Sequence, residues 1–283
     1  YLSPINEPYW EWNKSGQEAN RYSIKDIKKL IIELNKKLKQ NKLDTEILVP
    51  EAGDYAALLD DEFYQQLTEG KKAKYDSDLE EKYNGKYREY IKELIGDDSI
   101  RPKISNMLAA HSYWTDYKGE QLKSIREMVR KNIDKYNSQT KIWQTEYCIL
   151  GEKQYIRGSG RNLGMKPALF VARTIHNDLT ALNASAWQWW LSVSPYNYKD
   201  GLLYTNYSEP GDKQNIYTSK IFWGLGNYSK FIRPGATRIK LEGADDPEEL
   251  MGSAYIGNNK EKMIIALVNY SRDEKNIKIN IKG

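Results

Sequence analysis

Two glutamates stand where apolar, strand-like stretches end, and glutamate is a residue type that performs acid–base and nucleophilic chemistry. Glu7 closes "LSPINEP" at residues 2–8, between Asn6 and a proline. Glu146 lies in "KIWQTEYCIL" at 141–150, a run of β-branched and aromatic residues that favours a strand. One carboxylate at a strand end says little about function. Two such carboxylates could face each other across the mouth of an active site.

A pair of carboxyl groups in this arrangement is what glycoside hydrolysis requires. One group, held protonated, donates to the departing glycosidic oxygen, and the other attacks the anomeric carbon. A separation of about 5 to 5.5 Å gives retention through a covalent glycosyl-enzyme. Asn6 could then hydrogen-bond the sugar 2-hydroxyl. This chemistry needs neither a metal nor an organic cofactor, and no Cys/His grouping in the sequence has zinc-ligand spacing.

Strand-like and helix-like segments alternate along the first 234 residues. Strand candidates lie near residues 2, 46–53, 104–114, 141–150 and 184–194, and helical patterns cover residues 24–40, 120–137, 167–183 and 218–232. Ser23 is the expected N-cap of the first helix. The alternation predicts right-handed βαβ units around a parallel sheet. The charged, Tyr-rich residues 60–98 are interpreted as a helical insertion or lid.

After Pro234 the pattern changes to short alternating strands without helices between them. The four stretches are separated by Gly, Asn and Asp turns, and they read "TRIKLEG", "LMGSAYIGN", "KMIIALVNYS" and "KNIKINIKG". This pattern predicts the start of an antiparallel β-domain. We therefore predict two parts, residues 1–234 and residues 235–283.

Two α/β folds fit the first part, an open doubly wound sheet and part of a (β/α)8 barrel. The open sheet predicts a Gly-rich phosphate loop, for which "GSGRNLG" at 158–164 is a weak match. A barrel predicts polar residues at the C-terminal ends of several strands. The sequence has such residues besides the glutamate pair and Asn6: Glu51, His111, Tyr113, Trp114 and Trp189. We therefore favour a partial (β/α)8 barrel, in which Glu146 lies three strands after Glu7 and faces it across the mouth.

Composition narrows the classes of partner. The 43 basic and 39 acidic residues nearly balance, which argues against a nucleic-acid surface. No apolar run reaches the roughly 18 residues of a membrane helix. A single cysteine, Cys148, rules out an internal disulfide framework. The 22 Tyr and 8 Trp against 4 Phe suit a surface that is both apolar and hydrogen-bonding, such as a carbohydrate groove.

Three motifs together resemble glycoside hydrolase family 30. "SPINEP" is similar to the Asn-Glu-Pro signature on strand four of the retaining clan, and "WQTEYC" to the family's strand-seven nucleophile motif. "GNYSKFIRPGATRI" resembles the passage from its last barrel helix into a β-sandwich domain. The resemblance implies that Glu7 is the acid/base, Glu146 the nucleophile, and Asn6 the contact to the 2-hydroxyl.

The resemblance also implies substrate-binding roles for aromatic and imidazole side chains. His111 and Tyr113 fall where the family places side chains around the nucleophile, and Trp189 matches the strand-eight Trp beneath the sugar. Trp10 and Trp114 are further candidate sugar platforms. For His111 the alternative is a core histidine with satisfied hydrogen bonds, and for Trp189 it is a packed core residue.

Counted against the family, the chain begins at strand four and lacks strands one to three and most of the sandwich. We therefore expect a fragment of a longer protein, poorly stable and inactive on its own. A secretion signal is expected upstream, which implies a secreted, periplasmic or cell-surface enzyme that acts on an oligo- or polysaccharide. We expect it to be a monomer.

For the substrate, "SPINEPYWEW" and "EAGDY" look most like the endo-β-1,6-galactanase branch of the family. A glucuronoxylanase would carry a basic clamp near the strand-eight loop, where Lys199 is the only cation in "SPYNYKDGLLYTN". A β-1,6-glucanase and a glucosylceramidase are further family activities. Two alternatives come from other classes. One is a catalytically inactive carbohydrate-binding protein, and the other a nucleotide-dependent α/β enzyme, for which the phosphate loop is missing.

Overall fold

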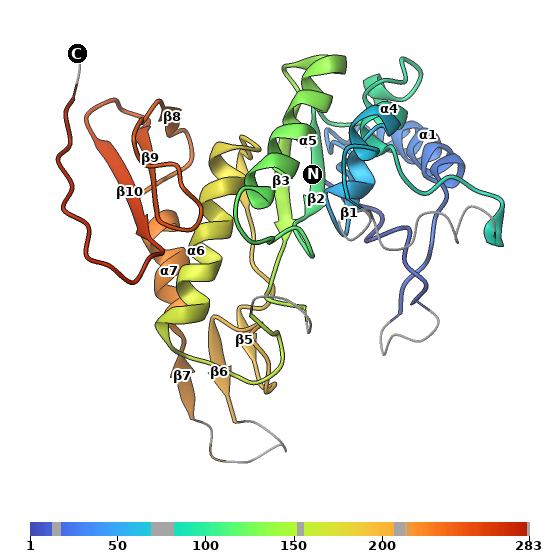
Figure 1. The fold of residues 1–283 in the computed structure, drawn as a ribbon. Helices are drawn as coiled ribbons and strands as arrows, with labels where there is room; N and C mark the ends of the chain where they lie inside the picture. Colours follow the sequence, from blue (N-terminus) through green and yellow to red (C-terminus); the bar gives the residue numbers. More distant parts are fainter. Residues whose placement is uncertain (13–17, 69–81, 152–155, 207–212, 214, 282–283) are drawn as a thin grey trace.

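The computed structural model describes residues 1–12, 18–68, 82–151, 156–206, 213 and 215–281, and Figure 1 shows their arrangement. At the centre is a four-stranded sheet in the order β1-β2-β3-β4. Its strands are β1 (Val49–Ala52), β2 (Met107–His111), β3 (Lys141–Glu146) and β4 (Ala186–Trp187), and every neighbouring pair is parallel. The predicted parallel α/β sheet is therefore confirmed. The four strands form an open sheet among the described residues, and the partial (β/α)8 barrel stays a prediction.

The strand predicted near residue 2 is reduced to a single bridge. Leu2 pairs in parallel with Ile47, and its amide and carbonyl bond to Glu46 and Leu48, both at 2.9 Å. Pro4 follows two residues later and has no N–H to donate, so a longer ladder cannot form there. The segment nevertheless continues beside β1.

The helices agree closely with the periodicity of the sequence. α1 (Ile24–Gln40) begins at the predicted residue because the Ser23 hydroxyl accepts a hydrogen bond from the Asp26 amide at 3.3 Å. Its apolar stripe, Ile24, Ile27, Ile31 and Leu38, is buried. The other predicted helices are α5 (Gln121–Asn137), α6 (Met165–Thr180) and α7 (Lys220–Ser229).

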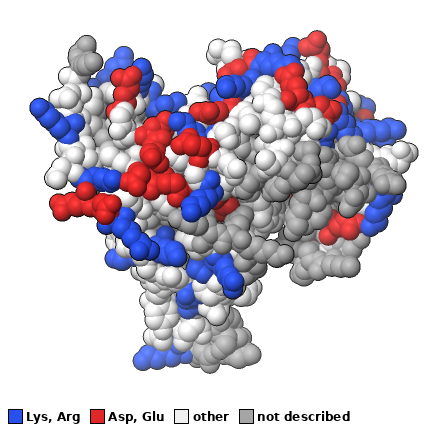
Figure 2. Space-filling view, viewed as in Figure 1, with Lys and Arg blue, Asp and Glu red and all other residues white. Residues whose placement is uncertain are grey.

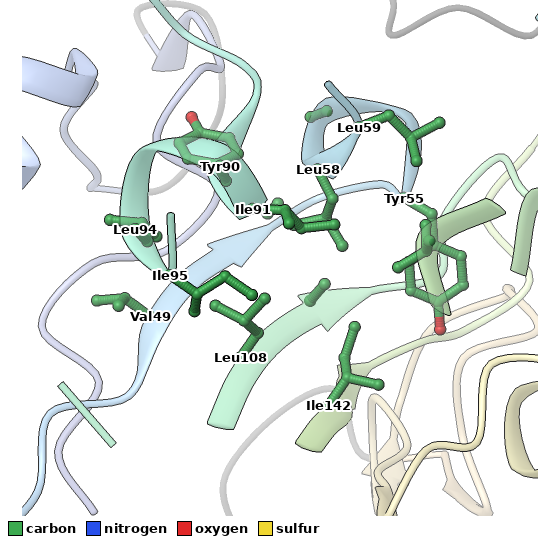
Figure 3. Close-up of a cluster of buried hydrophobic side chains, with 14 of the residues drawn as sticks. Val49, Tyr55, Leu58, Leu59, Tyr90, Ile91, Leu94, Ile95, Leu108 and Ile142 are labelled. Carbon is green, nitrogen blue, oxygen red and sulfur yellow. The ribbon is translucent and has the colours of Figure 1, made fainter. Parts of the chain in front are cut away.

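Part of the predicted insertion at 60–98 belongs to the core. After η2 (Ala56–Leu58), α2 (Asp61–Tyr64) lies at its start and α4 (Tyr90–Leu94) near its end, before η4 (Arg101–Lys103). Residues 69–81 lie outside the described chain. Ile91 and Leu94 are fully buried in the same cluster as Val49 and Leu108, as Figure 3 shows. The interpretation as a lid is therefore wrong for α4, whose apolar side chains help to cover the sheet.

The single buried strand predicted over residues 184–194 is also wrong. β4 ends after two residues, and β5 (Val193–Ser194) joins β6 (Leu203–Thr205) and β7 (Ile216–Thr218) in a separate sheet. Trp187 ends β4 and Trp189 follows two residues later, and both indole N–H groups donate to residues outside the sheet. Trp187 Nε1 donates to Asp178 Oδ2, and Trp189 Nε1 to the Asp200 carbonyl, both at 2.8 Å.

Three of the four strands predicted after Pro234 are confirmed. β8 (Thr237–Ile239), β9 (Leu250–Ile256) and β10 (Met263–Asn269) form an antiparallel sheet in the order β10-β9-β8. The described residues 275–281 of the fourth stretch form no strand. α6 packs against this sheet, because Met251 and Val268 share a core cluster with Phe170 and Ile175. The boundary at residue 234 stays a prediction.

A buried ion pair ties the helices to the sheet. Arg126 on α5 donates from Nε to Asp178 Oδ1 on α6 at 2.7 Å, and both side chains are fully buried. The same oxygen accepts from the Tyr55 hydroxyl at 2.8 Å. Removing one partner of such a pair typically costs about 3 to 5 kcal/mol. The network thus holds α5, α6, β4 and the loop after β1 in one arrangement.

The surface agrees with the balanced composition. On the face drawn in Figure 2, acidic and basic side chains are interspersed, and no continuous basic face is visible there. Among the described helices, none combines the length and apolar character needed to span a bilayer.

Candidate active site

The predicted catalytic residues gather at the C-terminal edge of the parallel sheet. His111 ends β2 and Glu146 ends β3, and the two residues pair in the strand register. Glu7 joins the same edge from the segment beside β1, because its amide donates to the Glu51 carbonyl at 2.8 Å. Parallel strands present their carboxyl ends on one side, so residues far apart in the sequence meet here.

Both glutamates approach the same nitrogen of His111. His111 Nδ1 is 2.9 Å from Glu7 Oε1 and 3.8 Å from Glu146 Oε1. One carboxylate oxygen of each glutamate and one nitrogen of the ring all lie within 4.8 Å of one another. The structure therefore brings together the pair that the sequence predicts.

Glu7 is held in a confined position. It is 7% exposed and has a φ of 43°. A Cβ on Gly53 would lie 2.9 Å from Glu7 Oε1 and 3.0 Å from the Tyr9 hydroxyl, so only glycine leaves room for the carboxylate. Glu51 and Trp114 also have a positive φ, 54° in both. Such backbone strain concentrates at functional sites.

His111 is buried, with 1% exposure, yet it is surrounded by carboxylates. Burial alone would lower its pKa, but hydrogen bonds to Glu51 and Glu7 and the charge of Glu146 raise the pKa to about 9. The alternative of a purely structural core histidine does not account for its contact with both members of the glutamate pair.

Glu146 is more accessible than Glu7, with a side chain 21% exposed against 9%. Its Oε1 accepts a hydrogen bond from the Tyr113 hydroxyl at 2.9 Å. Burial raises the pKa of Glu146, the charge of His111 opposes this, and the charge of Glu7 raises the pKa further. The carboxylate is thus fixed in position and remains reachable from outside.

Aromatic rings continue outward from the pair. The ring centroid of Trp114 lies 5.7 Å from that of Tyr113 and 5.1 Å from that of Trp10. On the other side, Tyr147 packs edge-on against Trp189 at 6.0 Å. The structure therefore groups the predicted aromatic residues around the glutamates, and Trp10, Trp114 and Trp189 are only partly buried.

The comparisons with known proteins identify the family of this chain. Residues 1–204 match the sequence profile described as O-Glycosyl hydrolase family 30. The chain belongs to this family. It is 30% identical, with a TM-score of 0.73, to the crystal structure of a conserved exported protein from Bacteroides fragilis, and the match covers 96% of this chain and 54% of that one.

Two structures of family 30 enzymes share the fold at lower identity. A subfamily 8 xylanase from Clostridium acetobutylicum matches with 18% identity and a TM-score of 0.56, over 95% of this chain and 50% of that one. An endoxylanase from Clostridium papyrosolvens matches with 15% identity and a TM-score of 0.56. The match covers 94% of this chain and 49% of that one. The family 30 chain therefore spans about half the length of these structures.

Asn6 is the predicted site residue with the fewest contacts. Its side chain is exposed and has no hydrogen-bond partner among the described residues of the family 30 chain. Its role toward a sugar hydroxyl stays a prediction.

The sequence places Glu51 at a strand end but assigns it no role. In the structure it is the third buried carboxylate of the site, 8% exposed and 3.5 Å from His111 Nε2. Position at a strand end, in "VPEAG", is the one signal that could have identified it. Its partners Ser3 and Thr145 carry no recognisable signal.

Glu7, His111 and Glu146 have the atom types of a metal site, and no other group among the described residues has this spacing. An imidazole that binds a metal must be deprotonated at the ligating nitrogen. His111 instead has a carboxylate facing each ring nitrogen, at 2.9 and 3.5 Å. These contacts favour a hydrogen-bonded acid–base cluster over a metal centre.

Proposed function

We propose that this family 30 chain contains the catalytic pair of a retaining β-glycosidase, with Glu146 as nucleophile and Glu7 as acid/base. The observation that supports it is the approach of the two carboxylates, whose oxygens lie within 4.8 Å of each other. Inverting enzymes separate their carboxyl groups by about 6.5 to 9.5 Å to leave room for a water molecule. The shorter separation suits direct attack by one of the glutamates.

In the first step a Glu146 oxygen forms a bond to the anomeric carbon as the glycosidic C–O bond breaks. The departing oxygen takes the proton of Glu7, which leaves Glu7 ionised. In the second step Glu7 removes a proton from water, and the water oxygen attacks the anomeric carbon. The bond to Glu146 breaks, so both carboxyl groups return to their starting state and the configuration is retained.

Two side chains orient this chemistry. The Tyr113 hydroxyl, 2.9 Å from Glu146 Oε1, stabilises the ionised nucleophile and holds its rotamer. Asn6 is proposed to bond the sugar 2-hydroxyl, an interaction that strengthens in the transition state. The partly exposed faces of Trp10, Trp114 and Trp189 are proposed sugar platforms.

For the substrate we propose a β-1,6-galactan, cleaved internally. The support is the resemblance of "SPINEPYWEW" and "EAGDY" to the galactanase branch. The cations near the strand-eight loop also argue against a clamp for a uronate, because they donate to backbone carbonyls. Lys199 donates to the carbonyls of Ser159 and Gly160, both at 2.7 Å. Arg161, which the sequence does not associate with this loop, donates to three backbone carbonyls, those of residues 195, 196 and 205.

We further propose that the protein works outside the cytoplasm. The support is the similar Bacteroides fragilis protein, which is described as exported. We propose that the substrate of the family 30 chain is a polysaccharide, and we expect this chain to act as a monomer.

The decisive test uses the protein expressed from its natural gene. Product analysis on β-1,6-galactan, β-1,6-glucan, glucuronoxylan and glucosylceramide identifies the substrate, and no release from the galactan would rule out our first choice. Glu146→Ala should abolish turnover while sparing binding, and the matched control is Glu33→Ala on the exposed face of α1. Binding without turnover in the unaltered protein would instead indicate a carbohydrate-binding protein.

Azide distinguishes the roles of the two glutamates on a substrate with a good leaving group. In Glu146→Ala, azide replaces the nucleophile and should give the glycosyl azide of inverted configuration. In Glu7→Ala, azide attacks the glycosyl-enzyme and should give the retained product. The opposite stereochemistry in the two variants would reverse our assignment of acid and nucleophile.

A further inference from the structure

Glu51 is a buried carboxylate at the same edge of the sheet, and the double displacement gives it no step. Each of its oxygens has a partner. Oε1 accepts from the Ser3 hydroxyl at 2.8 Å, while Oε2 accepts from the Thr145 hydroxyl and lies 3.5 Å from His111 Nε2. Its backbone carbonyl accepts from the Glu7 amide at 2.8 Å. Glu51 thus touches every strand or segment that supplies the catalytic pair.

The ring of His111 lies between two carboxylates. Nδ1 is 2.9 Å from Glu7 and Nε2 is 3.5 Å from Glu51. A neutral imidazole has one N–H and one lone pair, so one of its nitrogens would point a lone pair at a carboxylate oxygen. Only the doubly protonated ring donates in both directions. The other titratable groups that face the ring are Glu146, at 3.8 Å, and Tyr113, with ring centroids 5.8 Å apart.

We propose that Glu51 is a positioning residue of this site: it keeps His111 doubly protonated, and the cationic ring in turn fixes which oxygen of Glu7 delivers the catalytic proton. This inference rests on the proposed glycosidase function. Because Glu7 Oε1 accepts from the ring, its proton is carried on Oε2.

The charge of Glu51 also protects the proton on Glu7. A cation beside a carboxyl group favours its ionised form, so an uncompensated imidazolium would make Glu7 release its proton at lower pH. Glu51 supplies the compensating negative charge from a group that does not react. Its surroundings keep it ionised, because burial raises the pKa of Glu51 but the bonds from His111, Thr145 and Ser3 outweigh burial and lower it.

Tyr9 and Asp54 complete the surroundings of Glu7. The Tyr9 hydroxyl donates to Asp54 Oδ2 at 3.0 Å, and burial raises the pKa of Asp54 to about 6. Neither of them contacts His111 in the described structure. Their contribution to the pH profile is therefore common to all the variants compared below.

The kinetic test compares Glu51→Gln with Thr145→Val in the natural gene product. The first removes the charge and keeps the size, whereas the second removes one hydrogen bond to the same carboxylate and keeps the charge. A neighbouring charge shifts a pKa by about 1 to 3. In Glu51→Gln we expect the alkaline limb of kcat/KM to move down by about one pH unit, and in Thr145→Val we expect it to stay in place. An unmoved limb in Glu51→Gln, or equal movement in both variants, would overturn the proposal.

A second readout does not depend on activity. The ¹⁵N resonances of the His111 ring, identified by their loss in His111→Asn, report how many of its nitrogens are protonated. We expect both to be protonated at neutral pH in the unaltered protein, with a titration midpoint at least one pH unit lower in Glu51→Gln. A ring that is neutral at pH 7 in the unaltered protein would overturn the proposal even if the enzyme is active. Absence of hydrolysis in the unaltered protein would refute the glycosidase function, and the ring titration would still decide the role of Glu51.

Discussion

His176 on α6 makes the packing of this helix sensitive to acid. Its side chain is 1% exposed, and neither ring nitrogen has a hydrogen-bond partner among the described residues. The pKa of His176 is lowered from 6.5 to about 4, mainly by burial and also by the charges of Arg238 and Lys123, while the charge of Asp245 opposes the shift. The folded protein therefore holds this imidazole neutral where an unfolded chain would protonate it.

The sign and size of the effect follow from proton linkage. Between pH 6.5 and pH 4 the unfolded chain binds the proton and the folded chain does not, so stability falls as the pH drops through this window. The full difference between the two pKa values corresponds to about 3.4 kcal/mol. Between pH 7 and pH 4.5, the part realised is about 2.4 kcal/mol.

His176→Leu should remove this dependence because leucine keeps the buried site filled and does not titrate. Hydrogen exchange of the α6 amides, corrected for the intrinsic rate, measures the opening free energy at pH 7 and pH 4.5. We expect protection to fall on acidification by about 60-fold more in the unaltered protein than in the variant, which is the same 2.4 kcal/mol. An equal loss of protection in both proteins would refute the reasoning.

Two further substitutions test the geometry of the site. Tyr113→Phe removes the 2.9 Å hydrogen bond that lowers the pKa of Glu146, so the acidic limb of kcat/KM should move to higher pH and kcat should fall by about 10-fold, with melting temperature as the control. Gly53→Ala places a Cβ 2.9 Å from Glu7 Oε1, and displacement of this carboxylate should lower kcat/KM by about 100-fold. Turnover of Gly53→Ala close to that of the unaltered enzyme would mean that Glu7 does not depend on the space at Gly53.

The long helices could be predicted from sequence because their signals are local. α1 has a complete apolar stripe and a capping serine, and it begins at the expected residue. Strand lengths depend instead on partners that are distant in the sequence. The segment near Leu2 forms a single bridge before Pro4, and β4 pairs with β3 at only two positions.

The insertion at 60–98 also shows that local sequence does not determine which residues are buried. Its charged residues suggest a solvated lid, yet α4 buries Ile91 and Leu94 against the sheet. The three buried residues of α4, Tyr90, Ile91 and Leu94, give too little periodicity in so short a helix to outweigh a charged composition. Only the packed structure shows that they cover β1 and β2.

Within the site, the glutamate pair was predictable and its supporting groups were not. Glu7 and Glu146 follow apolar runs, which is a pattern that a single sequence displays. The contact of Glu51 with Ser3, His111 and Thr145 depends on the order of three neighbouring segments in the sheet. No spacing along the chain encodes such a contact, so the sequence alone assigns Glu51 no role.

The two histidines show why burial alone does not determine charge. His111 and His176 are equally buried, at 1% exposure. The pKa of His111 rises to about 9, because hydrogen bonds to Glu51 and Glu7 outweigh its burial, and the pKa of His176 falls to about 4, because burial acts there without a bonded anion.

Their effects on stability therefore have opposite signs. The contribution of His111 is fully present below pH 6.5 and is lost as the pH rises through 9, whereas the penalty from His176 begins below pH 6.5 and grows toward pH 4. The combined contribution of these two residues is greatest close to pH 6.5. Replacing His176 by leucine should extend that range toward acid without moving the alkaline side, because the charged contacts of His111 remain in place.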